Sequence, residues 1–548
     1  MHLESRKLPL LLTLAVLLAA TGCSRNSPSP APAQPEAAPA VAKSESTAHL
    51  PPGIEWFAGD VDAAFAAAKA AGKPLFLFWG AEWCPPCAQI KSTIFNTREF
   101  QERSRLFVPV YLDGDTPSAQ RQGERFGVVG YPTMILFRAD GTEITRLPGG
   151  VDVTRYATIL DTALGEARPV ADILRAALDG SALDAGDWQL LAYYSWGTDN
   201  GRLVPPAEAV ATFRKLAAAV PPEYQPERGR LYFEFLRAAA VAASKGSSPL
   251  DGDARRQEVL TLTRLLGTPD VASANVENLL YAPKDAIGVL SDPGTPERGQ
   301  LVSAWRAALD GLARGDGGVR LSGPEQINRV RARVALQKLE TPDAPLPPGL
   351  LDEARATVAR VDAAATETYA RHAAVNAAAN LYWDAGLDEE ADRMLKAELE
   401  RSKSPYYFML NLAELAKKAG REGEAVDWLA RAYAGAQGPA TRFQWGYNYL
   451  VGLLEMTPGD TARIERVALE VLGELGESPD AFYQRTQMRL EQLSTKLLEW
   501  GQGGEAAAVV GRLRARTGTI CAALPAGDPG RSHCEAFLNP SARATAGA

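Results

Sequence analysis

The chain has 548 residues and a formal net charge of −8, with 23% charged and 46% hydrophobic residues. This length allows two or three domains. The modest negative charge creates no basic field, so we do not expect nucleic acid as a partner. Beyond the N-terminal segment, no apolar run is long enough to cross a membrane, and we expect the remaining mass to be soluble.

The first 23 residues have the pattern of an export signal. A basic start and an apolar stretch over 8–20 precede small residues and then Cys23. The stretch is too short to span a bilayer as a stable helix. The pattern resembles a bacterial lipoprotein signal, although Ala20 stands where those signals more often have Leu. The resemblance implies that Cys23 is lipidated and becomes the mature N-terminus. An ordinary signal peptide cut nearby and an uncleaved anchor are the alternatives.

The residues after Cys23 predict where such a lipoprotein resides. In the lipoprotein pattern an Asp directly after the lipidated Cys favours inner-membrane retention, and this chain has Ser24 instead. The resemblance therefore implies a periplasmic, lipid-anchored protein, on the outer membrane rather than the inner one. Residues 24–51 are rich in Pro, Ala and Ser and cannot bury enough apolar surface to fold, so they form a predicted tether.

The stretch 52–168 alternates between helical and strand periodicity. Asp60 is placed to cap a helix through Ala71, which Gly72 ends. We expect the further elements to follow as a strand at 75–79, a helix from Cys84, a short helix near 97–104, a strand at 107–112, a helix at 118–126, hairpin strands at 133–137 and 143–147, and a helix at 153–164. The order αβαβαββα predicts an α/β domain.

Cys84-Pro85-Pro86-Cys87 opens the second of these helices, directly after Trp83. Two thiols three positions apart close a small disulfide that is easily attacked and re-formed. A thiolate at a helix N-terminus faces unsatisfied N–H groups, which lower its pKa to roughly 3.5–7.5 in thiol oxidoreductases. We therefore expect Cys84 to attack a substrate disulfide and Cys87 to resolve the mixed disulfide. Pro85 and Pro86 carry no N–H to stabilise a thiolate, which favours a reductant.

The strand that runs into this dithiol, with Tyr131-Pro132 just before the third strand, resembles the thioredoxin fold. The stretch 73–149 most resembles the C-terminal catalytic domain of DsbD-type thiol:disulfide interchange proteins. The matching segments are Ala81-Glu82-Trp83-Cys84, Thr93-Ile94-Phe95 and Gly130-Tyr131-Pro132-Thr133. The resemblance implies a cis peptide bond at Pro132 and a backbone edge at Tyr131 with which an extended substrate pairs. Trp83, Tyr131 and Pro132 are thus the predicted substrate-binding residues, with a plain turn aromatic as the alternative for Tyr131.

The chain departs from the thioredoxin pattern at one position. Thioredoxins carry a buried Asp six residues before the first Cys, where it helps to deprotonate the resolving thiol, and this chain has Phe78. Proton transfer must then use water or another acid. Glu82 is the nearest candidate by sequence and is our third predicted catalytic residue; a solvated residue of the loop is the alternative.

Other uses of the dithiol fit the sequence less well. A zinc site needs about two more ligands, but the other cysteines are distant and the four His residues are scattered. We therefore predict no metal. We also find no Gly-rich phosphate or dinucleotide fingerprint and expect no cofactor. Reducing equivalents must then arrive from a separate electron donor, either membrane-bound or soluble.

Beyond 169 the pattern is helical to the end, and we expect an all-α domain over 169–548. Leu381, Gly386 and Ala391 recur as Leu415, Gly420 and Ala425, at an offset of 34 residues. This period is similar to tetratricopeptide repeats, so we predict such hairpins near 370–515, with a degenerate copy at Gly501. A generic helical bundle is the alternative.

Two cysteines remain near the C-terminus, Cys521 and Cys534. An oxidising compartment would pair them around a Pro- and Gly-rich loop, and we expect a structural disulfide; two free thiols are the alternative.

These features together predict an exported, membrane-tethered thiol:disulfide oxidoreductase with a large helical domain. Its expected substrates are disulfide-containing exported proteins. The competing hypothesis is a helical scaffold or chaperone-like lipoprotein, in which the dithiol is secondary or acts as an isomerase.

Overall fold

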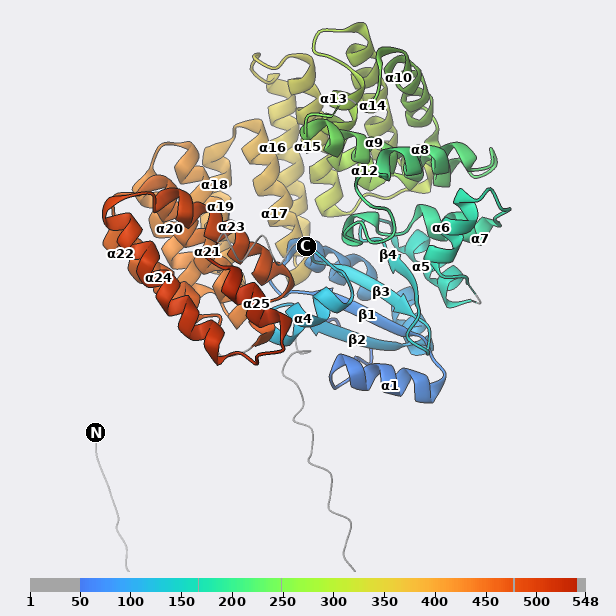
Figure 1. The fold of residues 1–548 in the computed structure, drawn as a ribbon. Helices are drawn as coiled ribbons and strands as arrows, with labels where there is room; N and C mark the ends of the chain where they lie inside the picture. Colours follow the sequence, from blue (N-terminus) through green and yellow to red (C-terminus); the bar gives the residue numbers. More distant parts are fainter. Residues whose placement is uncertain (1–49, 166, 248, 477–478, 540–548) are drawn as a thin grey trace, which may run out of the picture. The chain divides into compact units, whose positions relative to one another are not determined.

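The structure is a computed structural model that describes residues 50–539 except 166, 248 and 477–478. The predicted signal, Cys23, Ser24 and nearly all of the tether lie outside the described residues, so those predictions stay open. Within the described ranges, no helix combines the length and the hydrophobicity that crossing a bilayer requires. We refer to 50–165 as the sheet region and to 167–539 as the helical region (Figure 1).

The sheet region follows the predicted order of elements. Its elements are α1 (Val61–Ala71), β1 (Leu75–Gly80), α2 (Pro85–Ile90), the π-helix η2 (Lys91–Phe95), α3 (Arg98–Arg103), the 3-10 helix η3 (Ser104–Leu106), β2 (Val108–Asp113), α4 (Pro117–Arg125), β3 (Thr133–Phe137), β4 (Glu143–Leu147) and α5 (Val153–Leu164). The boundaries of the hairpin strands and of α5 agree with the prediction. The π-helix that continues α2 was not predicted.

The four strands lie in the order β2-β1-β3-β4. β1 pairs parallel with β2 and antiparallel with β3, and β3 pairs antiparallel with β4. Every residue of β1 is buried. This explains why its sequence is a continuous apolar run, since a central strand covered on both faces has no solvent side.

Alternate residues of β1 serve two separate cores. Leu75, Leu77 and Trp79 belong to a cluster with residues of α1 and α4, whereas Phe76 and Phe78 pack with residues of α2, α3 and α5. Successive side chains of a strand point to opposite faces, so helices cover both sides of the sheet. The result is the mixed α/β arrangement of the thioredoxin-like fold, followed by an all-helical region.

Local capping explains the helix ends that the sequence predicted. The side chain of Asp60 accepts a hydrogen bond from the N–H of Ala63 at 2.7 Å and so caps α1. Gly72 ends this helix in the left-handed conformation, with φ 62°. These contacts involve neighbours in sequence, which is why sequence alone could place them.

The helical region consists of many short and long helices. These are α6 (Val170–Leu178), α7 (Ala185–Ala192), η4 (Trp196–Thr198), α8 (Ala209–Ala219), α9 (Gln225–Ser244), α10 (Gly252–Leu266), α11 (Pro269–Ala274), α12 (Val276–Tyr281), α13 (Pro283–Leu290), α14 (Pro296–Arg314), η5 (Asp316–Gly318), α15 (Gly323–Glu340), α16 (Pro348–Ala364), α17 (Thr368–Ala385), α18 (Asp388–Glu398), α19 (Pro405–Lys418), α20 (Glu422–Gly435), α21 (Pro439–Met456), α22 (Thr461–Gly473), η6 (Pro479–Phe482), α23 (Gln484–Trp500), α24 (Gly504–Ala523) and α25 (Pro529–Ala536).

The 34-residue offset corresponds to two consecutive helix pairs, α17 with α18 and α19 with α20. Gly386 and Gly420 follow the first helix of each pair, and both are left-handed, with φ 73° and 72°. Leu381 and Leu415 are buried at equivalent positions. Gly501 differs, because its φ is −81°. The hairpins therefore repeat, whereas their assignment to the tetratricopeptide class stays a prediction.

The C-terminal cysteines form the predicted disulfide. Cys521 near the end of α24 and Cys534 in α25 are bonded, with their Cα atoms 5.5 Å apart. Both residues are buried. The bond joins the last two helices across the Pro- and Gly-rich turn between them.

The helical region contacts the sheet region along several elements. α17 packs against α2, and η6 and α23 pack against α4. Arg121 of α4 forms an ion pair with Asp528 at 2.7 Å, and Gln484 donates a hydrogen bond to the carbonyl of Gly123 at 3.3 Å. All described residues fall in one compact unit, so the predicted boundary near 168 separates two folds but not two independent bodies.

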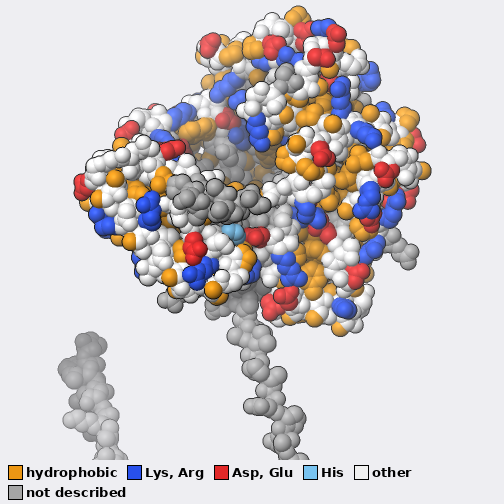
Figure 2. Space-filling model, in the orientation of Figure 1, with side chains coloured by type: hydrophobic (Ala, Val, Ile, Leu, Met, Phe, Trp, Pro, Cys, Tyr) orange, Lys and Arg blue, Asp and Glu red, His pale blue; other side chains and the backbone are white. Residues whose placement is uncertain are grey.

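Charged side chains of both signs are mixed on the surface. On the face drawn in Figure 2, basic and acidic side chains lie among hydrophobic ones without a large area of either sign. Several opposite charges are paired, for example Arg103 with Asp161 at 2.6 Å and Lys417 with Glu455 at 2.8 Å. This mixing agrees with the modest net charge.

Candidate active site

The dithiol lies where β1 ends and α2 begins. Cys84 is the N-cap residue of α2, with extended backbone geometry, and Pro85 is the first helical residue. Cys84 and Cys87 form a disulfide with their Cα atoms 5.2 Å apart. The Sγ of Cys84 also accepts a hydrogen bond from the N–H of Cys87 at 3.2 Å. The first helical turn therefore aims a backbone donor at the sulfur that was predicted to attack.

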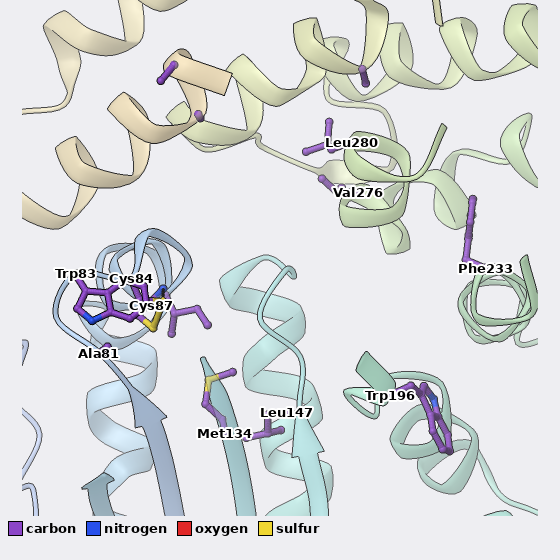
Figure 3. Close-up of a cluster of buried hydrophobic side chains, with 14 of the residues drawn as sticks. Ala81, Trp83, Cys84, Cys87, Met134, Leu147, Trp196, Phe233, Val276 and Leu280 are labelled. Atoms are coloured by element: carbon purple, nitrogen blue, oxygen red, sulfur yellow. Dashed lines mark hydrogen bonds between the residues drawn. A yellow bond between two sulfur atoms is a disulfide. The ribbon is translucent and has the colours of Figure 1, made fainter. Parts of the chain in front are cut away.

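Both cysteines are shielded from bulk solvent. Cys84 is 3% exposed and Cys87 is fully buried. Figure 3 shows the two sulfurs at the end of β1, with Met134 on one side and the helix that carries Leu280 across from them. Access to Cys84 therefore depends on what lies against each side of the dithiol.

The Tyr131–Pro132 peptide bond is cis, as the family resemblance implied. The ring of Tyr131 contacts Trp79 and Trp83, with centroid distances of 4.7 and 5.8 Å. Its hydroxyl donates a hydrogen bond to the carbonyl of Gly114 at 3.1 Å. The side chain of Tyr131 is thus half-buried among these contacts, and substrate binding at its backbone edge stays a prediction.

Helices from the C-terminal half cover the Trp83 side of the dithiol. The indole N–H of Trp83 donates to Thr441 Oγ1 of α21 at 2.9 Å and to Asp115 Oδ1 at 3.1 Å. Its ring also contacts Trp445 at 4.8 Å and Tyr407 at 6.1 Å between centroids. The cavity left at this contact measures only about 10 Å³. Trp83 therefore anchors the helical region, a contact that the sequence did not predict.

Two basic residues complete this covered side. The guanidinium of Arg485 in α23 lies over the rings of Trp83 and Tyr131, 5.2 and 5.1 Å from their centroids. His372 Nε2 lies 3.0 Å from the carbonyl oxygen of Trp83. Burial lowers the pKa of His372 to about 4, so its ring is neutral at pH 7 and donates to that carbonyl.

Asp115 links the sheet region to α21. Its carboxyl group accepts hydrogen bonds from Trp83 and from the hydroxyl of Thr441. Burial, together with the smaller effect of the nearby Asp113 charge, raises the pKa of Asp115 to about 7, against the opposing effect of these hydrogen bonds. The joint between the two regions thus contains an acid that titrates near neutral pH.

A buried lysine begins the π-helix η2, directly after α2. Lys91 is one helical turn after Cys87 and is 1% exposed. Its Nζ makes no hydrogen bond within the described part of the chain, and it lies 5.3 Å from the ring centroid of Tyr369 and 5.8 Å from that of Tyr111. Burial lowers the pKa of Lys91 to about 8.

Glu82 is the residue predicted to move protons, and Phe78 stands where thioredoxins carry an Asp. Phe78 is fully buried and pairs in the sheet with Tyr111, so no carboxylate occupies that position. A Cβ on Gly80 would lie 3.4 Å from the Sγ of Cys87, which shows how closely the backbone approaches the resolving sulfur. Glu82 is half-buried, and its charge acts to raise the pKa of Lys91. The catalytic role of Glu82 stays a prediction.

The opposite side of the dithiol opens into a cavity of about 410 Å³, which we call the dithiol cleft. The sheet region contributes Pro85, Pro86, Tyr131 and Pro132 to its wall. The helical region contributes a second set of lining residues, which includes Glu277, Leu280, Tyr281, Asn328 and Asn376. This volume lies within the usual range for ligand sites. Pro85 and Pro86, which lie between the two cysteines in sequence, line the cleft, so it is the candidate approach to the dithiol.

Sequence reasoning missed most of the helical residues at this site. His372 entered the sequence analysis only as one of four scattered His residues, and Glu277 and Thr441 were not considered. Lys91 carried a usable signal, since a residue four positions after Cys87 shares its helix face. The other three lie roughly two hundred to three hundred and fifty positions from the dithiol, and no local pattern marks them.

The comparisons with known proteins agree with this geometry. A family model described as a thioredoxin-like domain matches residues 61–164. The chain is 36% identical over 124 residues to the thiol:disulfide interchange protein DsbD of Cronobacter sakazakii, covering 22% of this chain and 21% of that protein. It is 30% identical over 107 residues to DsbD 1 of Pseudomonas aeruginosa, covering 19% and 18%. The chain thus spans about a fifth of the length of these DsbD relatives.

A smaller relative is matched over most of its length. The thioredoxin of Pseudomonas aeruginosa is 32% identical over 95 residues, which is 17% of this chain and 81% of that protein. The dithiol at the N-terminus of α2 and the cis-proline before β3 lie inside the matched family model. Through its sheet region, this chain belongs to the thioredoxin family.

Proposed function

We propose that the protein is a thiol:disulfide oxidoreductase that reduces disulfides of exported proteins. The observation that carries this proposal is a dithiol at a helix N-terminus, beside a cis-proline, that opens on one side into a cleft of about 410 Å³. The family membership of the sheet region supports the same chemistry.

The proposed cycle transfers two electrons to the substrate. In the reduced protein, the Cys84 thiolate attacks one sulfur of the substrate disulfide, a mixed disulfide forms, and the other substrate sulfur leaves as a thiolate. Cys87 then attacks the Sγ of Cys84. The Cys84–Cys87 disulfide forms, and the second substrate sulfur is released. A separate dithiol donor reduces the protein again and is itself oxidised to a disulfide.

The direction of the reaction depends on how well the Cys84 thiolate is stabilised. Pro85 and Pro86 supply no N–H at the helix start, and the N–H of Cys87 is the donor that reaches Cys84. Fewer donors stabilise the thiolate less, so the reduced form is a stronger reductant. This argument favours a reductase over an oxidase.

We also propose that the protein is exported and held at a membrane by lipid on Cys23. The support is the N-terminal pattern, which ends in small residues and Cys23, and Ser24 favours the outer membrane. Replacing Cys23 by Ser should remove incorporation of labelled palmitate and release the protein from the membrane fraction. Co-fractionation only with inner-membrane markers would contradict the proposed outer-membrane location.

Trapping of partners tests the catalytic proposal. In cells that express the full chain with Cys87→Ser, Cys84 should remain bound to its partners as mixed disulfides, which mass spectrometry identifies. The double variant that also carries Cys84→Ser is the control and should trap nothing. Several exported proteins would indicate a broad reductase, and one dominant partner would indicate a dedicated pathway.

Insulin reduction separates the enzyme from a scaffold. The full chain with dithiothreitol should accelerate insulin precipitation, and Cys84→Ser should abolish the acceleration. A scaffold whose helical region performs the main task would show no turnover and no trapped disulfides. That combined result would overturn the proposal of an enzyme.

A further inference from the structure

A second cavity, on the helical region, adjoins the dithiol cleft. This cavity measures about 450 Å³ and lies against α17, α18 and α19. Pro86 and Asn376 line both cavities. The two cavities thus meet at Pro86, between the two cysteines in sequence, and at Asn376 of α17; one includes the cis-proline Pro132 in its wall and the other lies against the helix pairs. We call the second cavity the asparagine groove, after Asn376, Asn380 and Asn411, which line it.

These asparagines keep unused hydrogen-bonding atoms. Asn376 accepts a hydrogen bond from the hydroxyl of Tyr407 at 3.2 Å through Oδ1, and Asn380 donates to the backbone carbonyl of Asn376 at 2.9 Å. Within the described residues, Asn376 Nδ2, Asn380 Oδ1 and both amide atoms of Asn411 make no hydrogen bond. In the dithiol cleft, Asn328 donates to Tyr281 at 2.8 Å and keeps its Oδ1 unused.

A row of carboxamides matches the backbone of an extended polypeptide. Each carboxamide offers donors and an acceptor, as each peptide unit does. Asn376 and Asn380 are four positions apart and share a face of α17, and Asn411 continues the row on α19. An extended chain has unpaired N–H and C=O groups along its length, so successive asparagines contact successive peptide units without depending on their side chains.

The charges of the dithiol cleft select against small anionic disulfides. Its lining contains Glu277 and Glu325 but no Lys or Arg. Glu325 is engaged by the N–H and hydroxyl of Ser322, both at 2.7 Å. Glu277 makes no hydrogen bond or ion pair within the described part of the chain, and its side chain lies against Gly150, where a Cβ would approach it to 2.4 Å. A free carboxylate in the cleft favours a neutral or basic occupant.

We propose that the dithiol cleft and the asparagine groove form one site for an extended polypeptide segment that flanks the reactive cysteine, with a preference for a basic side chain near Glu277. This inference rests on the proposed function, because it names the kind of substrate that reaches Cys84. The helical region is then part of the substrate site, and its asparagines and Glu277 determine specificity.

Three thionitrobenzoate mixed disulfides test the proposal on the reduced full chain. The first is formed with N-acetylcysteine amide. The second is formed with the central Cys of an uncharged peptide of about eleven residues, which spans about 35 Å when extended. The third is formed with the same peptide carrying Lys two positions from the Cys. Attack by Cys84 releases the coloured thionitrobenzoate thiolate, whose low pKa makes it the leaving group.

The uncharged peptide should react about tenfold faster than N-acetylcysteine amide. Asn376→Ala and Asn411→Ala should each lower this ratio about three- to tenfold, the effect of one or two hydrogen bonds. The Lys peptide should react about threefold faster still, and Glu277→Gln should remove that advantage. Asn278→Ala is the matched control, because Asn278 of α12 donates a hydrogen bond to Asn275, just before that helix, and lines neither cavity; it should leave every ratio unchanged.

The proposal would be overturned if the wild-type protein reacted equally fast with the uncharged peptide and with N-acetylcysteine amide. It would also be overturned if neither asparagine variant changed the ratio of these two rates. A direct binding measurement separates this failure from failure of the proposed function. A fluorescent peptide with Ser in place of Cys should bind the full chain in an anisotropy assay, and Asn411→Ala should weaken binding. One outcome is that the wild-type protein releases thionitrobenzoate from every probe no faster than the Cys84→Ser variant does, while the Ser peptide binds. This outcome would contradict the redox function and support the proposed peptide site. If thionitrobenzoate is released but the Ser peptide does not bind, the groove fails alone.

Discussion

The two sides of the dithiol differ in how the helical region meets them. On the Trp83 side the contact is tight, with two hydrogen bonds from the indole, several ring contacts and a residual cavity of about 10 Å³. On the Pro86 side the same region stands away and leaves about 410 Å³ beside Pro132. One side therefore holds the two regions together, and the other provides access.

This difference shows how helices cover a thioredoxin-like domain on one side of its dithiol and leave a cavity on the other. A small domain with a bare dithiol offers Cys84 to substrates from many directions. Here Trp83, at the edge of the dithiol, serves as an anchor for helices, and the approach narrows to one cleft. The variants described below each remove one contact or charge of the covered side, and substitutions elsewhere in the chain serve as controls.

Removal of the anchor should have the largest effect. Trp83→Ala deletes a ring that is 6% exposed, together with its hydrogen bonds to Thr441 and Asp115. The free energy of unfolding, measured by urea denaturation, should fall by about 3–5 kcal/mol. Trp500→Ala is the control, because Trp500 is partly buried and donates one hydrogen bond to Pro458. Trp500→Ala should lower the free energy of unfolding by less than half as much as Trp83→Ala. Equal losses in the two variants would contradict the role of Trp83 as an anchor.

The covered side should also depend on pH through Asp115. Its folded pKa of about 7 lies above the unfolded value, so the folded protein binds the extra proton between about pH 4 and 7 and loses stability as the pH rises through this window. Asp115→Asn keeps the hydrogen-bond acceptor for Trp83 and has no charge. It should remove this loss, on the order of 3 kcal/mol. Urea midpoints from pH 4 to 8 measure it, with the exposed Glu124→Gln as control.

His372 should show the opposite slope in nearly the same window. Its folded pKa of about 4 lies below the unfolded value, so the contribution of this residue to stability is lost as the pH falls below about 6.5. His372→Gln keeps a donor for the carbonyl of Trp83 and should flatten the acid limb of the same urea series. Parallel slopes in the two variants would show that neither group controls the joint.

A smaller effect is expected beneath the covered side, at Lys91. Its folded pKa of about 8 lies below the unfolded value, so the buried ammonium costs stability at neutral pH. Lys91→Met should raise the free energy of unfolding by on the order of 2 kcal/mol at pH 7, and this gain should shrink between pH 8 and 10.5.

The same variant tests a link between Lys91 and the resolving thiol. Without the nearby cation, the thiol of Cys87 should have a higher pKa in the reduced protein, and stopped-flow resolution of the mixed disulfide should slow about three- to tenfold at pH 7. Met is the suitable replacement because it keeps most of the side-chain volume. An unchanged rate in the stabilised variant would assign proton transfer to Glu82 or water.

The smallest effect is expected at Arg485. Arg485→Met removes a cation that lies over two aromatic rings, and the free energy of unfolding should fall by about 1 kcal/mol. Arg431→Met removes an equivalent contact with Trp428, at 4.0 Å, on an exposed surface of α20. That control should cost less because water screens the charge there. If the control costs more, burial at the joint does not strengthen the Arg485 contact.

The sheet region was largely predictable because its signals are local. The strand–helix alternation, the caps at Asp60 and Gly72 and the dithiol all depend on residues close in sequence, and the structure contains each of them. The cis peptide bond at Pro132 was implied by the family resemblance, and the structure contains it as well. The π-helix that starts at Lys91 was missed, since no residue type marks the change from i→i+4 to i→i+5 hydrogen bonds.

The sequence by itself determined the redox chemistry, the fold that carries it and the pairing of Cys521 with Cys534. Only the tertiary structure decided which side of the dithiol is open, because that depends on where α17, α21 and α23 meet the sheet region. Those positions are set by helix crossing angles and side-chain packing accumulated over several hundred residues. No local period or motif in the sequence encodes these helix positions. The sequence therefore indicated Trp83 as a substrate contact and did not indicate that it anchors the helical region.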